Sequence, residues 1–268
     1  KMTLDYKEEF SKMAVDQTKM GRVEHKIKKH INVAKHTSGT EFLQPKSWSG
    51  GNGLALEEYA PWGVIGNISP STHPSPTMLE NIIIQLAGGN TITFNPHPAA
   101  KKLNAYVIQK CNQYLIEQGA PENLVTCVSE PTLESAESMF RHPKVKLLSI
   151  TGGPGVVEAA MKCNKPVIAA GPGNPPVLID ETADLKLAAK EITQSASYDN
   201  NILCIAEKEV FIVESVYDQF MQLLTSEGNH KLTANQMDTL ADKALDLKGK
   251  HYLINRDYVG KNANVLAK

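Results

Sequence analysis

Residues 63–98 read GVIGNISPSTHPSPTMLENIIIQLAGGNTITFNPHP, and this stretch decides the fold. It opens with an apolar run of strand length at 63–68, continues with helical periodicity over 77–86, and returns to a second apolar run at 91–94. A strand, a helix and a second strand in this order predict a βαβ unit, in which the two strands run parallel.

The same alternation extends along the chain in both directions. Before it, a basic amphipathic segment at 6–33 is predicted to be helical, and a Gly/Ser/Pro-rich passage follows at 44–53. After it come further apolar runs and helical patterns, the runs at 124–128, 146–150 and 166–170 and the helices at 99–117, 133–140 and 155–162. Repeated βα units predict an α/β fold with a mostly parallel sheet and helices on both faces. The ligands of such sheets bind at the carboxyl ends of the strands.

Composition and charge narrow the range of partners. The 28 basic and 29 acidic residues give a formal charge of −1, which offers no general attraction to nucleic acid or to an anionic membrane. We therefore expect a small-molecule partner, with no nucleic acid and no membrane. The four cysteines lack the spacing of a zinc site or a disulfide frame, which predicts reduced thiols in the cytoplasm and no metal. Because the chain begins at Lys1 rather than methionine and stops at Lys268 after a charged stretch, we expect it to be a fragment.

Three loops of small and rigid residues follow strands of the predicted sheet, at 69–74, 95–98 and 151–155. Glycines allow a backbone to approach a phosphate closely, and a helix opening at Gly155 would direct free N–H groups at that anion. The coincidence of these three loops predicts a nucleotide site. A further loop at 170–176 follows the last strand of the series and is either a structural turn or a part of the site beside the nucleotide's reactive end. Tight turns remain the alternative for any single loop, and neither a GxGxxG motif nor a P-loop lysine is present.

Cys204 is the candidate nucleophile, because it follows the polar run 197–201 downstream of the predicted sheet. A thiolate attacks a carbonyl carbon without a dedicated base. The alternative is a buried structural thiol. The remaining cysteines are predicted to be bystanders. The basic run 26–30 is predicted to be a solvated helix face, with a phosphate site for coenzyme A as the alternative.

Sequence motifs in a fixed order run from MAV at 13–15 and MGRVE at 20–24 to RDYVG at 256–260. Between them lie PWGVIG (61–66), SPSTHP (69–74), NPHP (95–98), TGGPG (151–155), GPGNPP (171–176) and DNNILC (199–204). Together they resemble the CoA-acylating aldehyde dehydrogenases, and most closely the ethanolamine- and propanediol-utilisation type. The resemblance implies an aldehyde-dehydrogenase-like, Rossmann-type α/β fold. It also implies a dinucleotide-binding domain at 1–200, including the N-terminal helical segment, and the start of a second α/β catalytic domain at 201–268.

The resemblance also assigns chemistry to residues. Cys204 would add to the aldehyde carbonyl, pass hydride to NAD and be left as a thioester, which the thiol of coenzyme A would attack to release acyl-CoA. Hydrolytic relatives carry a water-activating Glu where this chain has Ala169, and an oxyanion-holding Asn where it has Thr72. The acylating relatives share this pattern, so both departures favour acylation, with Thr72 as a second catalytic residue.

The cofactor residues that the resemblance implies come from all four loops. The adenine side would lie near Pro96, His97 and Pro98, the pyrophosphate near Gly152, Gly153, Gly155 and Val156, and the ribose–nicotinamide passage near Ile68, Ser69, Pro70, Ala170 and Gly171. The choice between NAD and NADP stays open.

The expected activity is oxidation of acetaldehyde or propionaldehyde to acyl-CoA, in a homo-oligomer at full length, in the cytoplasm or inside a bacterial microcompartment in association with its shell. Two alternatives stay open. One is the dehydrogenase half of a bifunctional aldehyde-alcohol dehydrogenase, and the other is a nucleotide-binding or scaffold fragment without turnover.

Overall fold

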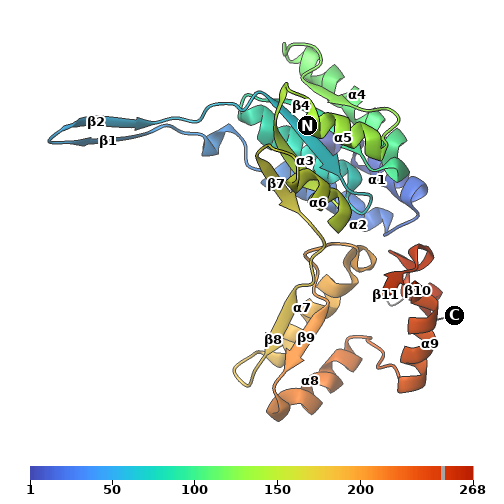
Figure 1. Ribbon diagram of the computed structural model, residues 1–268. Coiled ribbons are helices and arrows are strands. Elements are labelled where there is room, and N and C mark those ends of the chain that lie inside the picture. Colours follow the sequence, from blue (N-terminus) through green and yellow to red (C-terminus); the bar gives the residue numbers. More distant parts are fainter. Residues whose placement is uncertain (249–250, 268) are drawn as a thin grey trace. The chain divides into compact units, whose positions relative to one another are not determined.

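The computed structural model describes residues 1–248 and 251–267, and these residues form two compact units (Figure 1). Unit 1 comprises Lys1–Thr18 and Lys26–Pro172, and unit 2 comprises Lys19–His25 and Gly173–Lys268.

Unit 1 is built on a five-stranded sheet in the order β5-β4-β3-β6-β7, and all four neighbouring pairs are parallel. Its strands are β3 (Val64–Ser69), β4 (Thr91–Pro96), β5 (Val125–Cys127), β6 (Val145–Thr151) and β7 (Val167–Ala170). Each of these strands overlaps one of the apolar runs found in the sequence. The predicted parallel sheet is therefore confirmed.

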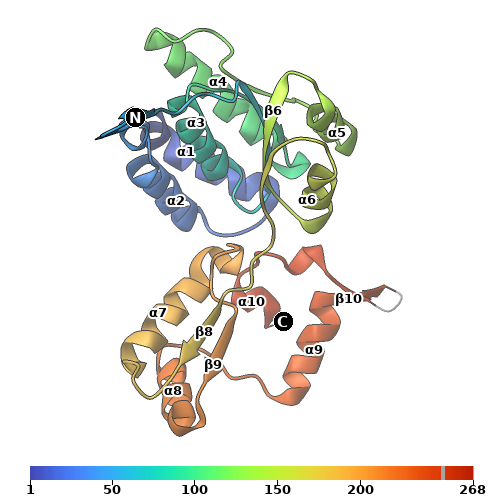
Figure 2. The same ribbon diagram turned by 60° about the vertical axis from the view of Figure 1, so that its left-hand side comes forward.

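Helices cover both faces of this sheet (Figure 2). One core joins α1 (Met2–Thr18), α3 (Pro74–Ala87) and α4 (Lys101–Glu117) to the sheet around Phe10, Met78 and Phe94, which are fully buried. The other core joins α5 (Leu133–Arg141) and α6 (Pro154–Met161) to it around Phe140 and Leu148. Two short 3-10 helices, Thr40–Phe42 and Pro98–Ala100, complete this part of the chain.

Two features near the N-terminus differ from the sequence-based expectation. The segment 6–33 is not one helix, because α1 ends at Thr18 and α2 (Val23–His36) starts after left-handed residues at Lys19 and Gly21. The Gly/Ser/Pro-rich passage at 44–53, for which the sequence predicted no strand, contributes to an antiparallel hairpin of β1 (Lys46–Gly50) and β2 (Gly53–Glu57). Every residue of both strands is exposed, and Figure 1 shows the hairpin reaching away from the sheet.

Unit 2 contains a second, smaller α/β layer. Its strands β8 (Pro176–Ile179) and β9 (Glu209–Ile212) are parallel, and α7 (Leu185–Ser197) and α8 (Glu214–Ser226) pack on them around Ile179, Ala189 and Phe220. The other elements of the unit are the 3-10 helices Tyr198–Asn201 and Arg256–Tyr258, α9 (Ala234–Ala244), the antiparallel pair β10 (Leu245–Lys248) and β11 (His251–Ile254), and α10 (Ala263–Leu266).

The boundary between compact units lies at Pro172–Gly173, whereas the sequence places the start of the catalytic domain at residue 201. The difference arises because β8, which precedes that point, pairs with β9, which follows it. The roles assigned to 1–200 and 201–268 stay predictions.

Within residues 1–248 and 251–267, no helix combines the length and apolar character that crossing a membrane requires. The same residues contain no group of three histidine, cysteine or acidic side chains arranged to hold a metal ion.

Candidate active site

The carboxyl ends of four strands of unit 1 meet at one edge of the sheet. Ser69 at the end of β3 is paired with Pro96 at the end of β4, and its carbonyl accepts a hydrogen bond from the His97 N–H at 3.1 Å. On the other side of β3, Thr151 at the end of β6 is paired with Ala170 at the end of β7. The predicted cofactor residues at or just beyond this edge are Ile68, Ser69, Pro70, Pro96, His97, Pro98, Gly152, Gly153, Gly155, Val156, Ala170 and Gly171. The structure thus brings the four predicted loops together.

The start of α6 offers backbone N–H groups in open surroundings. Gly153 caps the helix and Pro154 follows it, so the chain enters the helix in a fixed direction. A Cβ atom on Gly152 would lie 2.7 Å from Val156 Cγ1, so this position requires glycine. A Cβ on Gly153 or Gly155 would meet nothing within 4 Å, so the backbone there is accessible to a ligand. This geometry suits an anion such as a phosphate.

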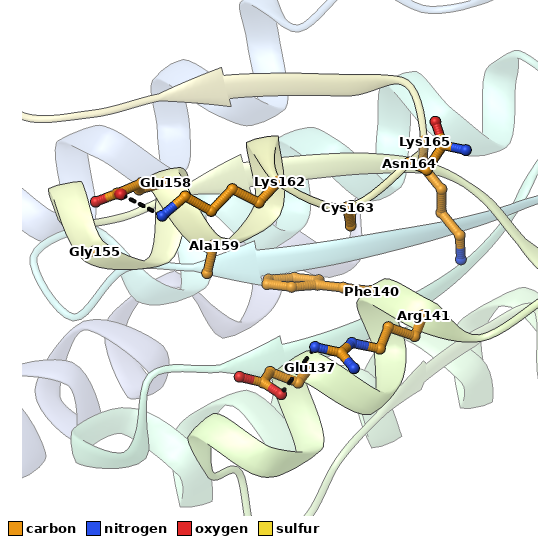
Figure 3. A pocket seen from close by; sticks show the side chains of 10 residues that line it. All are labelled: Glu137, Phe140, Arg141, Gly155, Glu158, Ala159, Lys162, Cys163, Asn164 and Lys165. Atoms are coloured by element: carbon orange, nitrogen blue, oxygen red, sulfur yellow. Dashed lines mark hydrogen bonds and ion pairs between the residues drawn. The ribbon is translucent and has the colours of Figure 1, made fainter.

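A pocket of about 670 Å³ lies between α5 and α6 and begins at Gly155. In Figure 3 the Phe140 ring lies between the two helices, with Ala159 close to it. Ion pairs line the pocket, with Arg141 held 3.7 Å from Glu137 and Lys162 held 2.6 Å from Glu158. An apolar floor with charged walls can accept a flat aromatic base with polar edges.

Lys165 also lines the pocket and donates to the His142 carbonyl at 2.5 Å. Burial lowers the pKa of Lys165 from its ordinary value. Of the residues that line this pocket, the sequence predicted only Gly155 as part of a site. The i,i+4 spacing of 137/141 and 158/162 indicates helix surface pairs and carries no information about a cavity.

Thr72 lies half-buried in the loop between β3 and α3, beside a buried basic cluster. The Lys26 ammonium donates to the Thr72 carbonyl at 3.4 Å. Lys26 is 2 % exposed, Lys29 6 % and His30 0 %. The prediction that the run 26–30 is a solvated helix face was therefore wrong, because the face of α2 that carries these three side chains points inward.

Two histidines of this cluster are kept neutral at physiological pH. Burial, with the charges of Lys26 and Lys29, lowers the pKa of His30 to about 4. His30 Nε2 is 2.9 Å from the Ser75 hydroxyl. Burial, followed by Lys29 and Lys26, also holds the pKa of His73 well below its usual range. His73 Nδ1 is buried without a hydrogen-bond partner in the part of the chain that the structure describes.

Cys204 is exposed, in contrast to a buried structural thiol. It follows the 3-10 helix Tyr198–Asn201, in which Asp199, Asn200 and Asn201 all have left-handed φ angles between 49° and 57°. Asn and Asp adopt this conformation more readily than other non-glycine residues, which explains their presence at three successive positions. The chain thereby turns sharply just before Cys204.

This turn is anchored within unit 2 by the segment 19–25. The Asp199 carboxylate accepts a hydrogen bond from the Arg22 backbone N–H at 2.7 Å, and the Asp199 backbone N–H donates to His25 Nδ1 at 2.8 Å. The Tyr198 and His25 rings stack at 4.4 Å, and the Tyr198 hydroxyl donates to the His25 carbonyl. Burial and the Asp199 charge raise the pKa of Tyr198 to about 12. The motifs MGRVE (20–24) and DNNILC (199–204) belong to these two segments, and neither motif indicates from its residues that the segments contact each other.

Two buried acceptors lie on the same loop, Asn201 Oδ1 and Glu207 Oε2, and neither meets a donor among the described residues. Unpaired buried acceptors are rare in folded proteins. The other cysteines differ from Cys204. Burial raises the pKa of Cys111 to about 12 and raises that of Cys127, while Cys163 donates to the Ala160 carbonyl. Cys204 is thus the exposed thiol of the described residues.

A parallel sheet with open loops at its carboxyl edge, followed by a second α/β unit with an exposed cysteine, is typical of a class of dehydrogenases. The family model "Aldehyde dehydrogenase family" matches residues 6–244, and the chain belongs to this family.

Among curated relatives, the chain is 46 % identical to the acetaldehyde dehydrogenase (acetylating) EutE of Salmonella typhimurium, over 97 % of this chain and 56 % of that protein. It is more distant from the bifunctional aldehyde-alcohol dehydrogenase AdhE of Escherichia coli, at 34 % identity over 96 % of this chain and 29 % of that protein.

Among solved structures, a propionaldehyde dehydrogenase from the Clostridium phytofermentans fucose utilisation bacterial microcompartment gives a TM-score of 0.94 at 44 % identity, over 99 % of this chain and 60 % of that one. The Rhodopseudomonas palustris propionaldehyde dehydrogenase with bound propionyl-CoA gives 0.93 at 40 % identity, again over 99 % and 60 %. The chain thus spans little more than half the length of these relatives.

Proposed function

We propose that this chain is the part of a CoA-acylating aldehyde dehydrogenase that carries the nucleophile and the dinucleotide site. The whole protein oxidises acetaldehyde or propionaldehyde to acyl-CoA, with NAD and coenzyme A as cosubstrates. The observation that carries the proposal is the exposed Cys204 on an anchored, sharply turned loop. Its relatives support the acylating chemistry, since one is an acetylating acetaldehyde dehydrogenase and another binds propionyl-CoA.

The residues of unit 1 fit a dinucleotide. Gly153 and Gly155 leave open space in front of the first N–H groups of α6, where a pyrophosphate would sit beside Gly152 and Val156. The pocket between α5 and α6 adjoins Gly155 and would hold the adenine. Pro96, His97 and Pro98 would lie on the adenine side, and Ile68, Ser69, Pro70, Ala170 and Gly171 would line the ribose–nicotinamide passage at the sheet edge. The bound cofactor supplies a hydride acceptor.

The protein's own groups perform the covalent steps. The Cys204 thiolate forms a bond to the aldehyde carbon, and the carbonyl oxygen becomes an oxyanion. The Cys204 N–H makes no hydrogen bond among the described residues and can donate to this oxyanion. The family resemblance implies the Thr72 hydroxyl as a second donor. Loss of hydride leaves Cys204 as a thioester. The thiol of coenzyme A then attacks the thioester carbon, and Cys204 leaves as the thiolate.

By the family resemblance, Ala169 on β7 occupies the position of the water-activating Glu of hydrolytic relatives, and this favours acylation over hydrolysis. Its methyl group cannot accept a proton from water, whereas hydrolysis of a thioester at neutral pH needs such a base. The thioester therefore persists until coenzyme A arrives.

The likeness to a microcompartment enzyme supports placing the whole protein in such a compartment, in association with its shell. By the same resemblance it is a homo-oligomer. The compartment and the homo-oligomer are both proposed for the whole protein.

Aldehyde-dependent NADH formation by the natural-length protein tests the proposal. With acetaldehyde or propionaldehyde, we expect formation to need coenzyme A, and Cys204→Ser to lower the rate by at least about 10³-fold because the nucleophile is lost. Formation that proceeds without coenzyme A would show a hydrolytic enzyme. No formation with any aldehyde, while NAD still binds, would instead indicate a binding or scaffold role.

A further inference from the structure

Residues Gly173–Pro175 lie along the loop that carries Cys204, and both segments belong to unit 2. The Pro175 carbonyl accepts a hydrogen bond from the Lys208 N–H at 3.2 Å. The Asn174 side-chain amide donates to Glu209 Oε1 at 2.7 Å. Strand pairing of β8 with β9 begins immediately afterwards, so the two segments leave this region in register.

Gly173 approaches the nucleophile's own peptide group. A Cβ atom at this position would lie 2.1 Å from the Cys204 carbonyl oxygen and 3.1 Å from its carbonyl carbon. Real Cβ atoms do not approach other atoms this closely, and the obstacle is backbone that cannot rotate away. Any side chain at 173 must therefore displace the Cys204 peptide.

Lys208 holds the loop from the other end. Its ammonium donates to the Leu203 carbonyl at 2.8 Å and to the Ala206 carbonyl at 2.9 Å. Cys204 lies between these two residues in the sequence, so one cation bridges the peptide groups on both sides of it. Lys208 is an exposed residue, but hydrogen bonds from a charged donor are about twice as strong as neutral ones, and two of them from one ammonium restrain the loop. The Ala206 N–H also donates to the Leu203 carbonyl, closing the turn.

We propose that Lys208 and Gly173 are positioning residues for Cys204, holding its thiol and its N–H in the orientation that carbonyl addition requires. The inference rests on the proposed function for its kinetic part. Lys208 sets the curvature of the loop 203–206. Gly173 sets how close the segment Gly173–Pro175 lies to the Cys204 carbonyl. A misplacement of about 1 Å at a reacting group can cost about 10²-fold in rate, so small changes at these two positions have measurable effects.

The test compares Lys208→Met with Lys208→Arg and with Lys190→Met in the natural-length protein. Lys190 is an exposed lysine of α7, and its ammonium makes no ion pair or hydrogen bond in the described part of the chain. Two rates are measured for each variant. One is the rate at which iodoacetamide alkylates Cys204, read by peptide mass spectrometry, and the other is kcat for CoA-dependent NADH formation.

We expect Lys208→Met to lower kcat about tenfold and to slow alkylation of Cys204, with KM for NAD unchanged. Lys208→Arg should retain both rates within about twofold, because a guanidinium can donate to two carbonyls at once. Lys190→Met should match the unmodified protein. The inference is overturned if Lys208→Met matches Lys190→Met in both rates, or if its loss of kcat is explained by a lower melting temperature while Cys204 is alkylated at the normal rate.

Gly173→Ala provides a second variant, with Gly51→Ala as its control, because a Cβ at Gly51 meets nothing within 4 Å. The inference expects altered alkylation of Cys204 in the first variant only, and equal rates in both would overturn it for Gly173. Since alkylation needs no aldehyde, this comparison decides the positioning role even if no aldehyde is oxidised, which is the result that would defeat the proposed function.

Discussion

At the scale of single residues, His30 is a titratable group of unit 1 that burial holds neutral. Its imidazole is fully buried and lies within hydrogen-bond distance of the Ser11 hydroxyl, the Ser75 hydroxyl and the Lys26 carbonyl. Protonation would add a third positive charge beside Lys26 and Lys29 without water to solvate it. The pKa of His30 accordingly falls from 6.5 to about 4.

Stability should therefore depend on pH through this residue. Between pH 6.5 and 4 the unfolded chain binds a proton that folded His30 excludes, so lowering the pH favours unfolding. The contribution, about 3 kcal/mol in total, is fully present above pH 6.5 and is lost as the pH falls towards 4. Urea unfolding of the natural protein and of His30→Gln, measured from pH 7 to pH 5, tests this.

We expect the natural protein to lose about 1 to 2 kcal/mol more than His30→Gln over that interval. Because only the slopes are compared, any pH-independent effect of the substitution cancels. Equal slopes would show that His30 is not held neutral by the fold.

The site residues that were predicted from the sequence and those that were missed differ in the feature by which each is recognised. Cys204 and the glycines of TGGPG are marked by residue type, and their neighbours in sequence already indicate chemistry. Lys26 and His30 have the composition of a solvated surface, and the packing of α2 against α1 and α3 buries them. Lys208 was missed because its partners, the carbonyls of Leu203 and Ala206, belong to a loop whose curvature no local pattern specifies.

At the scale of elements, α5 is tied to the end of β4 through its first turn. Thr132 and Ser135 form a capping box, in which each side chain accepts from the other's N–H, at 3.0 and 2.8 Å. The Ser135 hydroxyl also donates to Asn95 Oδ1, at the start of the loop 95–98. The helix that lines the pocket is thus held to a loop of the candidate cofactor site.

Removing the cap should loosen this wall of the pocket. We expect Thr132→Ala to reduce the free energy of unfolding by about 1 kcal/mol and to raise the KM for NAD a few-fold. Thr132→Ser keeps the accepting oxygen and should behave as the natural protein does. Urea unfolding with NAD titration distinguishes the two, and a full effect from Thr132→Ser would contradict the capping explanation.

The elements most open to prediction were those with a buried face. Strands β3, β4 and β6 follow from apolar runs because the sheet buries them on both faces. The hairpin β1–β2 has no buried residue, so its Trp48, Leu54 and Leu56 form no inward-facing pattern that periodicity could detect. The break between α1 and α2 depends on backbone conformation at Lys19 and Gly21, which amphipathic spacing does not record.

At the scale of the whole chain, the two units have separate apolar cores. Unit 1 buries Phe10, Phe94 and Phe140, and unit 2 buries Phe220 against Ile179 and Ala189. The boundary between them was out of reach of sequence reasoning because β8 and β9 pair across about 30 intervening residues, which is a non-local contact.

Separate cores predict separate responses to a cavity. Phe220→Ala should cost about 3–5 kcal/mol, because Phe220 is fully buried. We expect amide hydrogen exchange to quicken in β8, β9, α7 and α8 and to stay slow in β3 and β4. Quickened exchange in both sets would mean that the units unfold together, and Tyr217→Ala, at a partly exposed position of α8, is the control.

Both tryptophans of the chain, Trp48 and Trp62, lie in unit 1, and each is more than half exposed to water. The intrinsic emission of the chain therefore originates from the hairpin and its continuation into the sheet. Neither tryptophan belongs to the core around Phe220 or to the loop that carries Cys204. A denaturation curve followed by tryptophan fluorescence would consequently record the unfolding of unit 1, and the unfolding of unit 2 needs a probe of its own.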